Sequence, residues 1–113
     1  MSTISTHVLD TARGRSAIGV AVVLEHQESG AWTKIASAQT DQDGRVAAGI
    51  LSPTSVSSGT YRLRFDTAGY FRTQKLDAFF PEVAITFTIR DSSEHHHVPL
   101  LLSPFGYSTY RGS

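Results

Sequence analysis

Residues 94–113 read EHHHVPLLLSPFGYSTYRGS, and this stretch decides the fold because it has the form of a β-hairpin. Its segment Ser103-Pro104-Phe105-Gly106 fits a four-residue turn, with proline at the second position and glycine at the fourth. Proline fixes φ at its position, and glycine relaxes the exit from the turn. We therefore expect the runs on either side to pair as antiparallel strands.

Strand alternation sorts the side chains of the first hairpin strand onto two faces. One face carries His96, Val98, Leu100 and Leu102, and the other carries His95, His97, Pro99 and Leu101. Past Val98 both faces are apolar, whereas a hairpin on the surface of a monomer should have one wet face. The second face is therefore expected to be covered, either by the rest of the domain or by another subunit.

The second hairpin strand leads into a tail with unusual chemistry. Tyr110, Arg111 and Ser113 bring a phenol, a guanidinium and a hydroxyl, and Ser108 shares the strand face of Tyr110. Chain ends are usually frayed and chemically plain. On composition alone, this tail is either a solvated end or part of a site.

The rest of the chain reads as a series of short strands. Alternation predicts strands over residues 4–10, 18–24, 32–40, 46–50, 61–66 and 83–89. The sharpest turn signal is Asp41-Gln42-Asp43-Gly44, since Asp-Gly supports positive φ. One short helix is expected over residues 68–76, before Pro81. About eight strands predict an all-β fold, an antiparallel β-sandwich made by one domain over residues 1–113.

Composition narrows the possible partners and compartments. The 113 residues include ten basic and ten acidic side chains, so the formal charge is zero, and no basic block is present. Nucleic acid and membrane surfaces are therefore poor partners. The absence of cysteine excludes disulfides, thiol catalysis and Cys-type zinc sites. Neither a secretory signal nor a membrane span is recognisable, so a cytoplasmic location is the default expectation.

Several segments of the chain resemble the transthyretin-like family. Residues 5–10 (STHVLD) match its first-strand motif, residues 40–45 (TDQDGR) match its Thr-Asp-x-x-Gly-Arg turn, and residues 95–113 match its C-terminal signature. Residues 79–82 (FFPE) also fit, so the resemblance covers nearly the whole chain. Within the family, the final Tyr-Arg-Gly-Ser separates hydrolases from hormone carriers. One departure is His96, where the family usually has tyrosine; because His96 points away from His97, we expect it to affect packing more than chemistry.

The resemblance implies a transthyretin-like fold and a specific activity. The implied reaction is hydrolysis of 5-hydroxyisourate to 2-oxo-4-hydroxy-4-carboxy-5-ureidoimidazoline in urate degradation, without metal or other cofactor. The small-molecule substrate is then the expected partner. The family also implies a homotetramer, a dimer of dimers with sites in the channel between the dimers.

Carried over residue by residue, the resemblance assigns catalysis to His7, Arg45 and His97 and substrate binding to Ser108, Tyr110, Arg111 and Ser113. Imidazole titrates near neutrality and can move a proton in either direction. Arg45 offers a planar donor fork for the carbonyls of an anionic ring. Each residue also has a plain structural alternative: a core histidine bonded to a carbonyl, or a solvated turn cation. Arg111 has the opposite strand parity to Tyr110, so it can clamp the tail instead of contacting ligand.

Two other classes of function stay open on the residues alone. One is a non-catalytic carrier of a planar aromatic ligand, which would not require His7, Arg45 or the terminal tetrapeptide. The other is a zinc-dependent hydrolase, since His95 and His97 share a strand face and His7 could be a third ligand. Metal analysis separates this last alternative from the other two.

Overall fold

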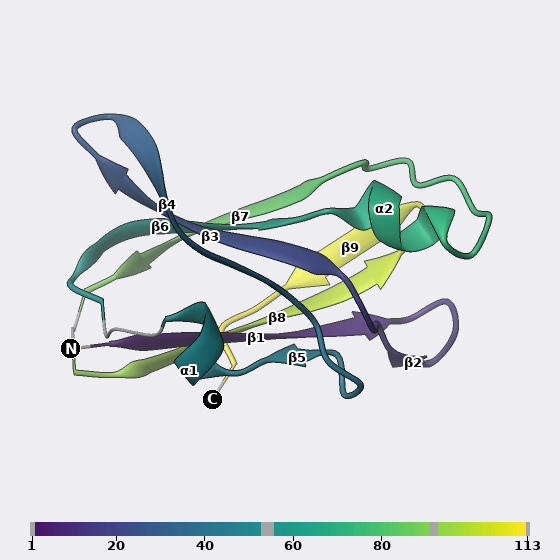
Figure 1. Cartoon of the computed structure of the whole chain (residues 1–113), viewed down its shortest axis with the longest axis horizontal. Coiled ribbons are helices and arrows are strands. Elements are labelled where there is room, and N and C mark those ends of the chain that lie inside the picture. The colour runs from purple at the N-terminus through teal and green to yellow at the C-terminus, as the bar shows by residue number, and fades with distance from the viewer. Residues whose placement is uncertain (1, 53–55, 91–92, 113) are drawn as a thin grey trace.

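The computed structural model describes residues 2–52, 56–90 and 93–112, and within them two β-sheets face each other. The elements, in chain order, are β1 (Thr3–Asp10), β2 (Arg15–Ser16), β3 (Ala21–Glu28), β4 (Ala31–Gln39), β5 (Arg45–Val46), α1 (Ala48–Leu51), β6 (Gly59–Phe65), α2 (Thr67–Arg72), β7 (Val83–Ile89), β8 (His95–Ser103) and β9 (Gly106–Thr109). Figure 1 shows the two layers, with α1 beside β1 and both termini toward that end of the molecule. The predicted β-sandwich is confirmed.

The first sheet has the order β2-β1-β8-β9, with β5 paired to β1, and the second has the order β4-β3-β6-β7. Most pairs are antiparallel, as expected, but β1 is parallel to β8 over the whole length of β1. Parallel neighbours need a long connection, and here the entire second sheet lies between them in sequence. Among the described residues no helix is long and apolar enough to cross a membrane.

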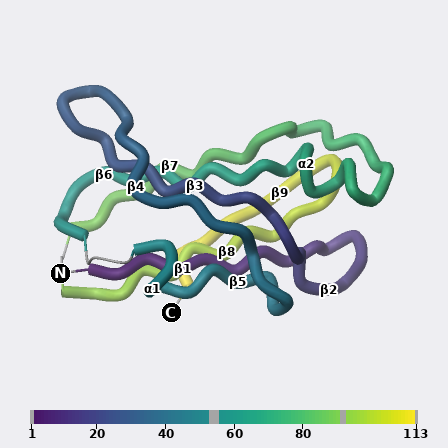
Figure 2. The backbone as a smooth tube through the Cα atoms, in the orientation of Figure 1, coloured from purple at the N-terminus to yellow at the C-terminus, as the bar shows by residue number. Residues whose placement is uncertain are grey.

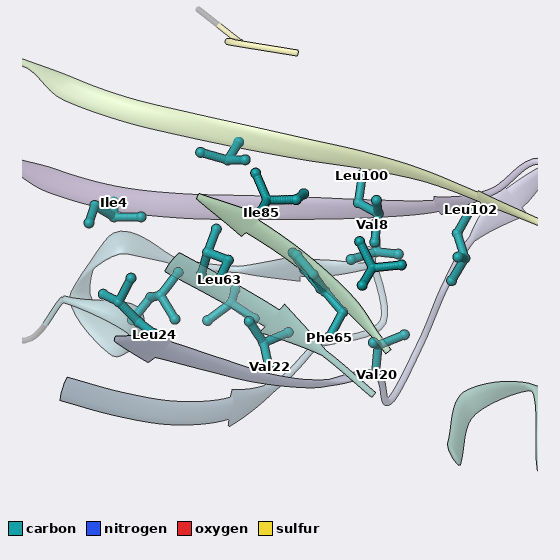
Figure 3. Packing of buried hydrophobic residues seen from close by; sticks show 14 of the residues in the cluster. Ile4, Val8, Val20, Val22, Leu24, Leu63, Phe65, Ile85, Leu100 and Leu102 are labelled. Atoms are coloured by element: carbon teal, nitrogen blue, oxygen red, sulfur yellow. The ribbon is translucent and has the colours of Figure 1, made fainter. Parts of the chain in front are cut away.

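The core lies between the two sheets, because the long strands β1, β3, β6, β7 and β8 turn alternate apolar side chains inward. Figure 3 shows this packing, with Ile4, Val8 and Leu100 from the first sheet meeting Val22, Leu63 and Phe65 from the second. Along β1 the even-numbered residues are buried and the odd-numbered ones are half-buried. The odd-numbered face of β1 therefore stays outside the core and is free to build a site.

The C-terminal hairpin forms as predicted. Ser103 pairs with Gly106 and Leu100 with Thr109, so the turn lies at Pro104 and Phe105. His96 is buried on the core face with Val98, whereas His95 and His97 lie on the opposite face. In Figure 2 the chain after α2 loops round the same end of the molecule as this turn, and the backbone N–H of Phe79 donates to the Pro104 carbonyl at 2.8 Å.

Three local predictions are wrong. The strand expected over residues 46–50 ends at Val46 and is followed by α1, a single turn that buries Leu51 and leaves Ile50 exposed. The strand expected from Ile18 begins only at Ala21, because the backbone N–H groups on either side of Ile18 bond to Val8 and Thr40 and Ile18 points outward. The helix expected over residues 68–76 spans Thr67–Arg72, since Lys75 adopts a positive φ of 60° that a helix cannot continue through.

Candidate active site

A cavity of about 600 Å³ opens on the outer face of the first sheet. It collects side chains from β1, the 41–45 turn, β8 and the C-terminal tail, and its polar lining includes Ser5, His7, Asp41, Arg45, His95, His97 and Tyr110. His7, Arg45, His97 and Tyr110 were all predicted as site residues, so the fold brings these four together. The segments that supply them are far apart in sequence and meet because β1 pairs with both β5 and β8.

The turn before Arg45 sets the position of its guanidinium beside His7. The Asp41 carboxylate accepts backbone N–H bonds from Asp43 at 2.8 Å and Arg45 at 3.0 Å, which closes the turn. Gly44 has φ of 73°, and a Cβ there would lie 2.5 Å from the Val8 carbonyl oxygen, so only glycine fits. Antiparallel pairing then places Arg45 directly opposite His7.

His97 is held from two sides. The parallel register places it opposite Ser5, whose hydroxyl lies 2.8 Å from Nδ1 of the imidazole. On the other side the tail crosses the strand, and the backbone N–H of Gly112 donates to the His97 carbonyl at 2.8 Å. A Cβ at Gly112 would lie 2.7 Å from Cδ2 of the ring, so glycine lets the tail approach the imidazole closely.

Two of the three pocket histidines, His7 and His97, have a lowered pKa, which favours the neutral form. Burial, and then the charge of Arg45, lower the pKa of His7 below its usual 6.5, although a backbone hydrogen bond with Asp43 opposes this. Burial, Arg45 and then the other two histidines of the pocket lower the pKa of His97 in the same way. A neutral imidazole has a free lone pair, so each ring can accept a proton near neutral pH.

One pocket atom is left without a protein partner. Nε2 of His7 is buried and has no hydrogen-bond partner among the described residues. Buried polar atoms are nearly always bonded, so this unsatisfied ring nitrogen is an exception. His7 therefore carries a proton donor or acceptor that no described residue uses, next to the Arg45 cation.

Two other predicted residues, Ser108 and Arg111, do not line this cavity. Ser108 pairs with Leu101 and lines a separate hollow nearer the hairpin turn. The Arg111 guanidinium binds the Glu94 carboxylate at 2.6 Å, which ties the tail to the start of β8. Ser113 lies outside the described residues, so its role stays a prediction, as does substrate binding by Ser108 and Arg111.

Sequence reasoning missed the part that Ser5 and His95 play. Both line the cavity, and the Ser5 hydroxyl lies within hydrogen-bonding distance of both His95 and His97. The shared strand face of Ser5 and His7 was a signal, but it could not reveal which strand would lie alongside. Among the residues that the structure describes, no three His, Asp or Glu side chains are placed to hold a metal ion together.

Replacing Gly112 by alanine should lower the rate of the hydrolysis that the family resemblance implies by roughly 10²-fold, because displacing a reacting group by about 1 Å can cost that much. The new methyl group meets the His97 ring at 2.7 Å and must push either the ring or the tail aside. The measurement is the steady-state rate of substrate hydrolysis in each variant. Gly49→Ala is the matched control, since its Cβ meets nothing within 4 Å. An unchanged rate in Gly112→Ala would show that the tail does not set the position of His97.

Imidazole titrations followed by NMR should show midpoints below pH 6.5 for both His7 and His97. Replacing Arg45 by glutamine should raise both pKa values, because the Arg45 charge is the second cause of each shift after burial. The unfolded chain binds these protons more readily than the folded one, so stability should fall as the pH drops through 6.5. Unmoved imidazole pKa values in Arg45→Gln would place the guanidinium away from the two rings.

The sequence matches the profile described as the HIUase/Transthyretin family over residues 4–112. The chain is 49% identical over 110 residues to the 5-hydroxyisourate hydrolase of Salmonella typhimurium, covering 97% of this chain and 80% of that protein. It is 43% identical over 114 residues to the 5-hydroxyisourate hydrolase of Mus musculus, covering 99% and 96%.

Solved structures show the same likeness in three dimensions. The 5-hydroxyisourate hydrolase of Klebsiella pneumoniae superposes with a TM-score of 0.89 at 36% identity, covering 100% of each chain. Sea bream transthyretin in complex with thyroxine gives a TM-score of 0.90 at 29% identity, covering 97% of this chain and 94% of that one. The same sandwich therefore occurs in hydrolases and in a thyroxine-binding protein.

Proposed function

The chain belongs to the HIUase/transthyretin family and hydrolyses 5-hydroxyisourate, and we propose that it does so in the cavity formed by His7, Arg45 and His97. The product is 2-oxo-4-hydroxy-4-carboxy-5-ureidoimidazoline, and the reaction belongs to urate degradation. The observation that carries this assignment is the meeting of His7, His97 and Arg45 in a single pocket, where burial and the Arg45 charge lower the pKa of both histidines.

Opening an acyl–nitrogen bond in the ring requires three things. A water molecule must lose a proton, the oxyanion that forms must be stabilised, and the leaving nitrogen must receive a proton. His7 and His97 suit the two proton transfers, because both imidazoles have a pKa lowered below the usual 6.5 and both face the same cavity. The Arg45 guanidinium suits the second task and also orients the anionic ring through its planar donors.

The tail completes the pocket in this proposal. Tyr110 lines the cavity, and Gly112 fixes the tail against His97. Arg111 supports this arrangement by holding Glu94, and we keep Ser108 and Ser113 as substrate-binding residues to be tested. A carrier would need a cavity but no pair of proton-transfer groups beside a cation, so the lining favours the hydrolase over the carrier.

The direct test is to mix the protein with freshly made 5-hydroxyisourate and follow the ultraviolet decay of the substrate. We expect decay far above the spontaneous rate, equally fast with and without a strong chelator, because the proposed proton transfers use side chains alone. Decay at the spontaneous rate would refute the assignment. Activity that is lost to the chelator and restored by zinc would support a zinc-dependent hydrolase instead.

We further propose that residues 1–113 act as one domain. We also propose a cytoplasmic location, because a chain without cysteine has no disulfide that reducing conditions could break. Assembly into a homotetramer, a dimer of dimers, is also proposed. Its support is an exposed aromatic cluster at one end: Phe79 is 70% and Phe105 77% exposed, and Phe80 packs edge-to-face on Tyr107 at 5.3 Å. Exposed apolar patches of this kind mark contact surfaces.

Light scattering at micromolar concentration should therefore give a mass four times that of the 12.3 kDa chain. Closed symmetric assemblies are the norm for soluble oligomers, and both β7 and β9 are edge strands that a second copy can extend. Replacing Phe79 by glutamate should reduce the mass if the aromatic cluster is a contact. A monomer in the unaltered protein would contradict the proposal.

A further inference from the structure

Four polar side chains form a continuous row on the outer face of the first sheet. Thr3 Oγ1 lies 2.6 Å from Nδ1 of His95, and Nε2 of the same ring lies 2.9 Å from the Ser5 hydroxyl. The Ser5 hydroxyl in turn lies 2.8 Å from Nδ1 of His97. The parallel register creates this row, because it sets Thr3 opposite His95 and Ser5 opposite His97.

When the Ser5 hydroxyl donates its proton within the row, the row has only two consistent hydrogen-bond directions. A hydroxyl donates one proton and accepts at its lone pairs, and a neutral imidazole donates from one nitrogen and accepts at the other. If Nδ1 of His97 donates to Ser5, then Ser5 donates to Nε2 of His95, and Nδ1 of His95 donates to Thr3. Nε2 of His97 is then left as a lone pair. With every bond reversed, the same atom carries a proton.

We propose that Ser5 and His95 are positioning residues that form a proton relay behind His97. The relay rests on the proposed hydrolase function and deepens it. In the first direction of the row, His97 is a general base, and in the second it is a general acid. Ser5 therefore decides which tautomer His97 presents, and His95 receives the proton that passes through.

The transfer balances atom by atom. The attacking water loses a proton to Nε2 of His97 as its oxygen bonds to the acyl carbon. The Nδ1–H bond of His97 breaks as a new Ser5 O–H bond forms, and Ser5 passes its former proton to Nε2 of His95. His97 ends neutral with its proton on Nε2, and His95 ends as the imidazolium. Reversing the relay returns a proton from Nε2 of His97 to the leaving nitrogen.

The surroundings favour moving the charge in this way. A cationic His97 would lie in a pocket that also holds Arg45 and His7, and its pKa is lowered by burial first, then by Arg45, His7 and His95. His95 lies on the exposed first position of β8, where water can solvate an imidazolium. The relay thus takes the positive charge away from Arg45 and toward solvent.

The test compares Ser5→Ala, Ser5→Thr and His95→Gln in the full-length protein with 5-hydroxyisourate. We expect Ser5→Ala and His95→Gln to lower kcat by about 10- to 100-fold with KM nearly unchanged, as removal of groups that orient a functional histidine does. Ser5→Thr keeps the hydroxyl and should restore kcat. The exposed strand serine in Ser37→Ala is the matched control and should leave kcat unchanged.

A spectroscopic readout separates this inference from the function itself. Nitrogen NMR of the His97 ring should show one dominant tautomer in the unaltered protein and a mixture of both in Ser5→Ala, whether or not substrate is hydrolysed. An unchanged tautomer and an unchanged kcat in Ser5→Ala would overturn the relay while leaving the hydrolase intact. Failure of Ser5→Thr to restore kcat would overturn it as well. Loss of turnover in the unaltered protein would instead refute the proposed function.

Discussion

Replacing His97 by alanine should lower the rate of 5-hydroxyisourate hydrolysis by about 10²- to 10⁴-fold, the usual cost of removing a proton-transfer group. The imidazole faces the cavity and not the core, so folding should lose little, near the low end of the ~0.5–3 kcal/mol range for point mutants. The measurement is substrate decay together with thermal unfolding of the same samples.

The matched control for this variant is His26→Ala, which removes a histidine from the second sheet, outside the cavity. It should retain the rate even if it loses some stability, because the His26 ring stacks on Tyr61 at 4.5 Å. Arg45→Ala should behave like His97→Ala, with a large loss of hydrolysis rate and a small loss of folding stability. If His97→Ala aggregated while its soluble fraction kept full specific activity, His97 would be a structural histidine.

Deleting residues 110–113 should lower the rate of hydrolysis by roughly 10²-fold or more, to a level that cannot be measured above the spontaneous reaction. The reason is that the tail both lines the pocket and holds His97 in position. The deletion removes the Tyr110 phenol, the Arg111–Glu94 ion pair and the Gly112 bond to the His97 carbonyl. The sandwich should remain, because β9 ends at Thr109 and the Thr109 hydroxyl still donates to the Pro99 carbonyl at 2.7 Å.

Circular dichroism should therefore match the intact protein while substrate decay falls to the spontaneous rate. The shortened protein should keep a wider cavity that can hold an aromatic ligand without turning it over. A small C-terminal tag should do similar harm by crowding the pocket, whereas an N-terminal tag serves as the control and should be tolerated. Full turnover in both the shortened and the C-terminally tagged proteins would show that the tail is a solvated end.

Local patterns predicted most of the fold because they depend on neighbours in the chain. The hairpin followed from its Pro-Phe turn, and the split of His96 from His97 followed from alternation alone. Prediction failed where a tertiary contact decides the outcome. Residues 48–51 continue an alternating pattern that predicts a strand, but they form the helical turn α1. In this conformation Leu51 reaches the core, and the Ser52 hydroxyl accepts a hydrogen bond from the backbone N–H of Ile4.

The sequence predicted which residues line the site, but not the hydrogen bonds between them. His7, Arg45, His97 and Tyr110 were expected, and the cavity includes all four. The Ser5 contacts were not expected, because they require the parallel register of two strands that nothing local in the sequence indicates. Ser108 illustrates the limit of parity arguments: it shares the outward face with Leu101, yet it lies along a different hollow in the single chain.

The parallel pairing of β1 with β8 also decides when the protein can first work. Paired residues such as Ser5 and His97 are 92 positions apart, so their contact is among the most costly in chain entropy to close. During synthesis the N-terminal strand emerges first, and it must wait for its central neighbour until nearly the whole chain has been made. A nascent chain that stops before residue 95 contains every strand of the second sheet and His7, but no His97. Activity should therefore appear only after β8 and the tail residues that follow it have been synthesised, as a single event with no partly active precursor before it.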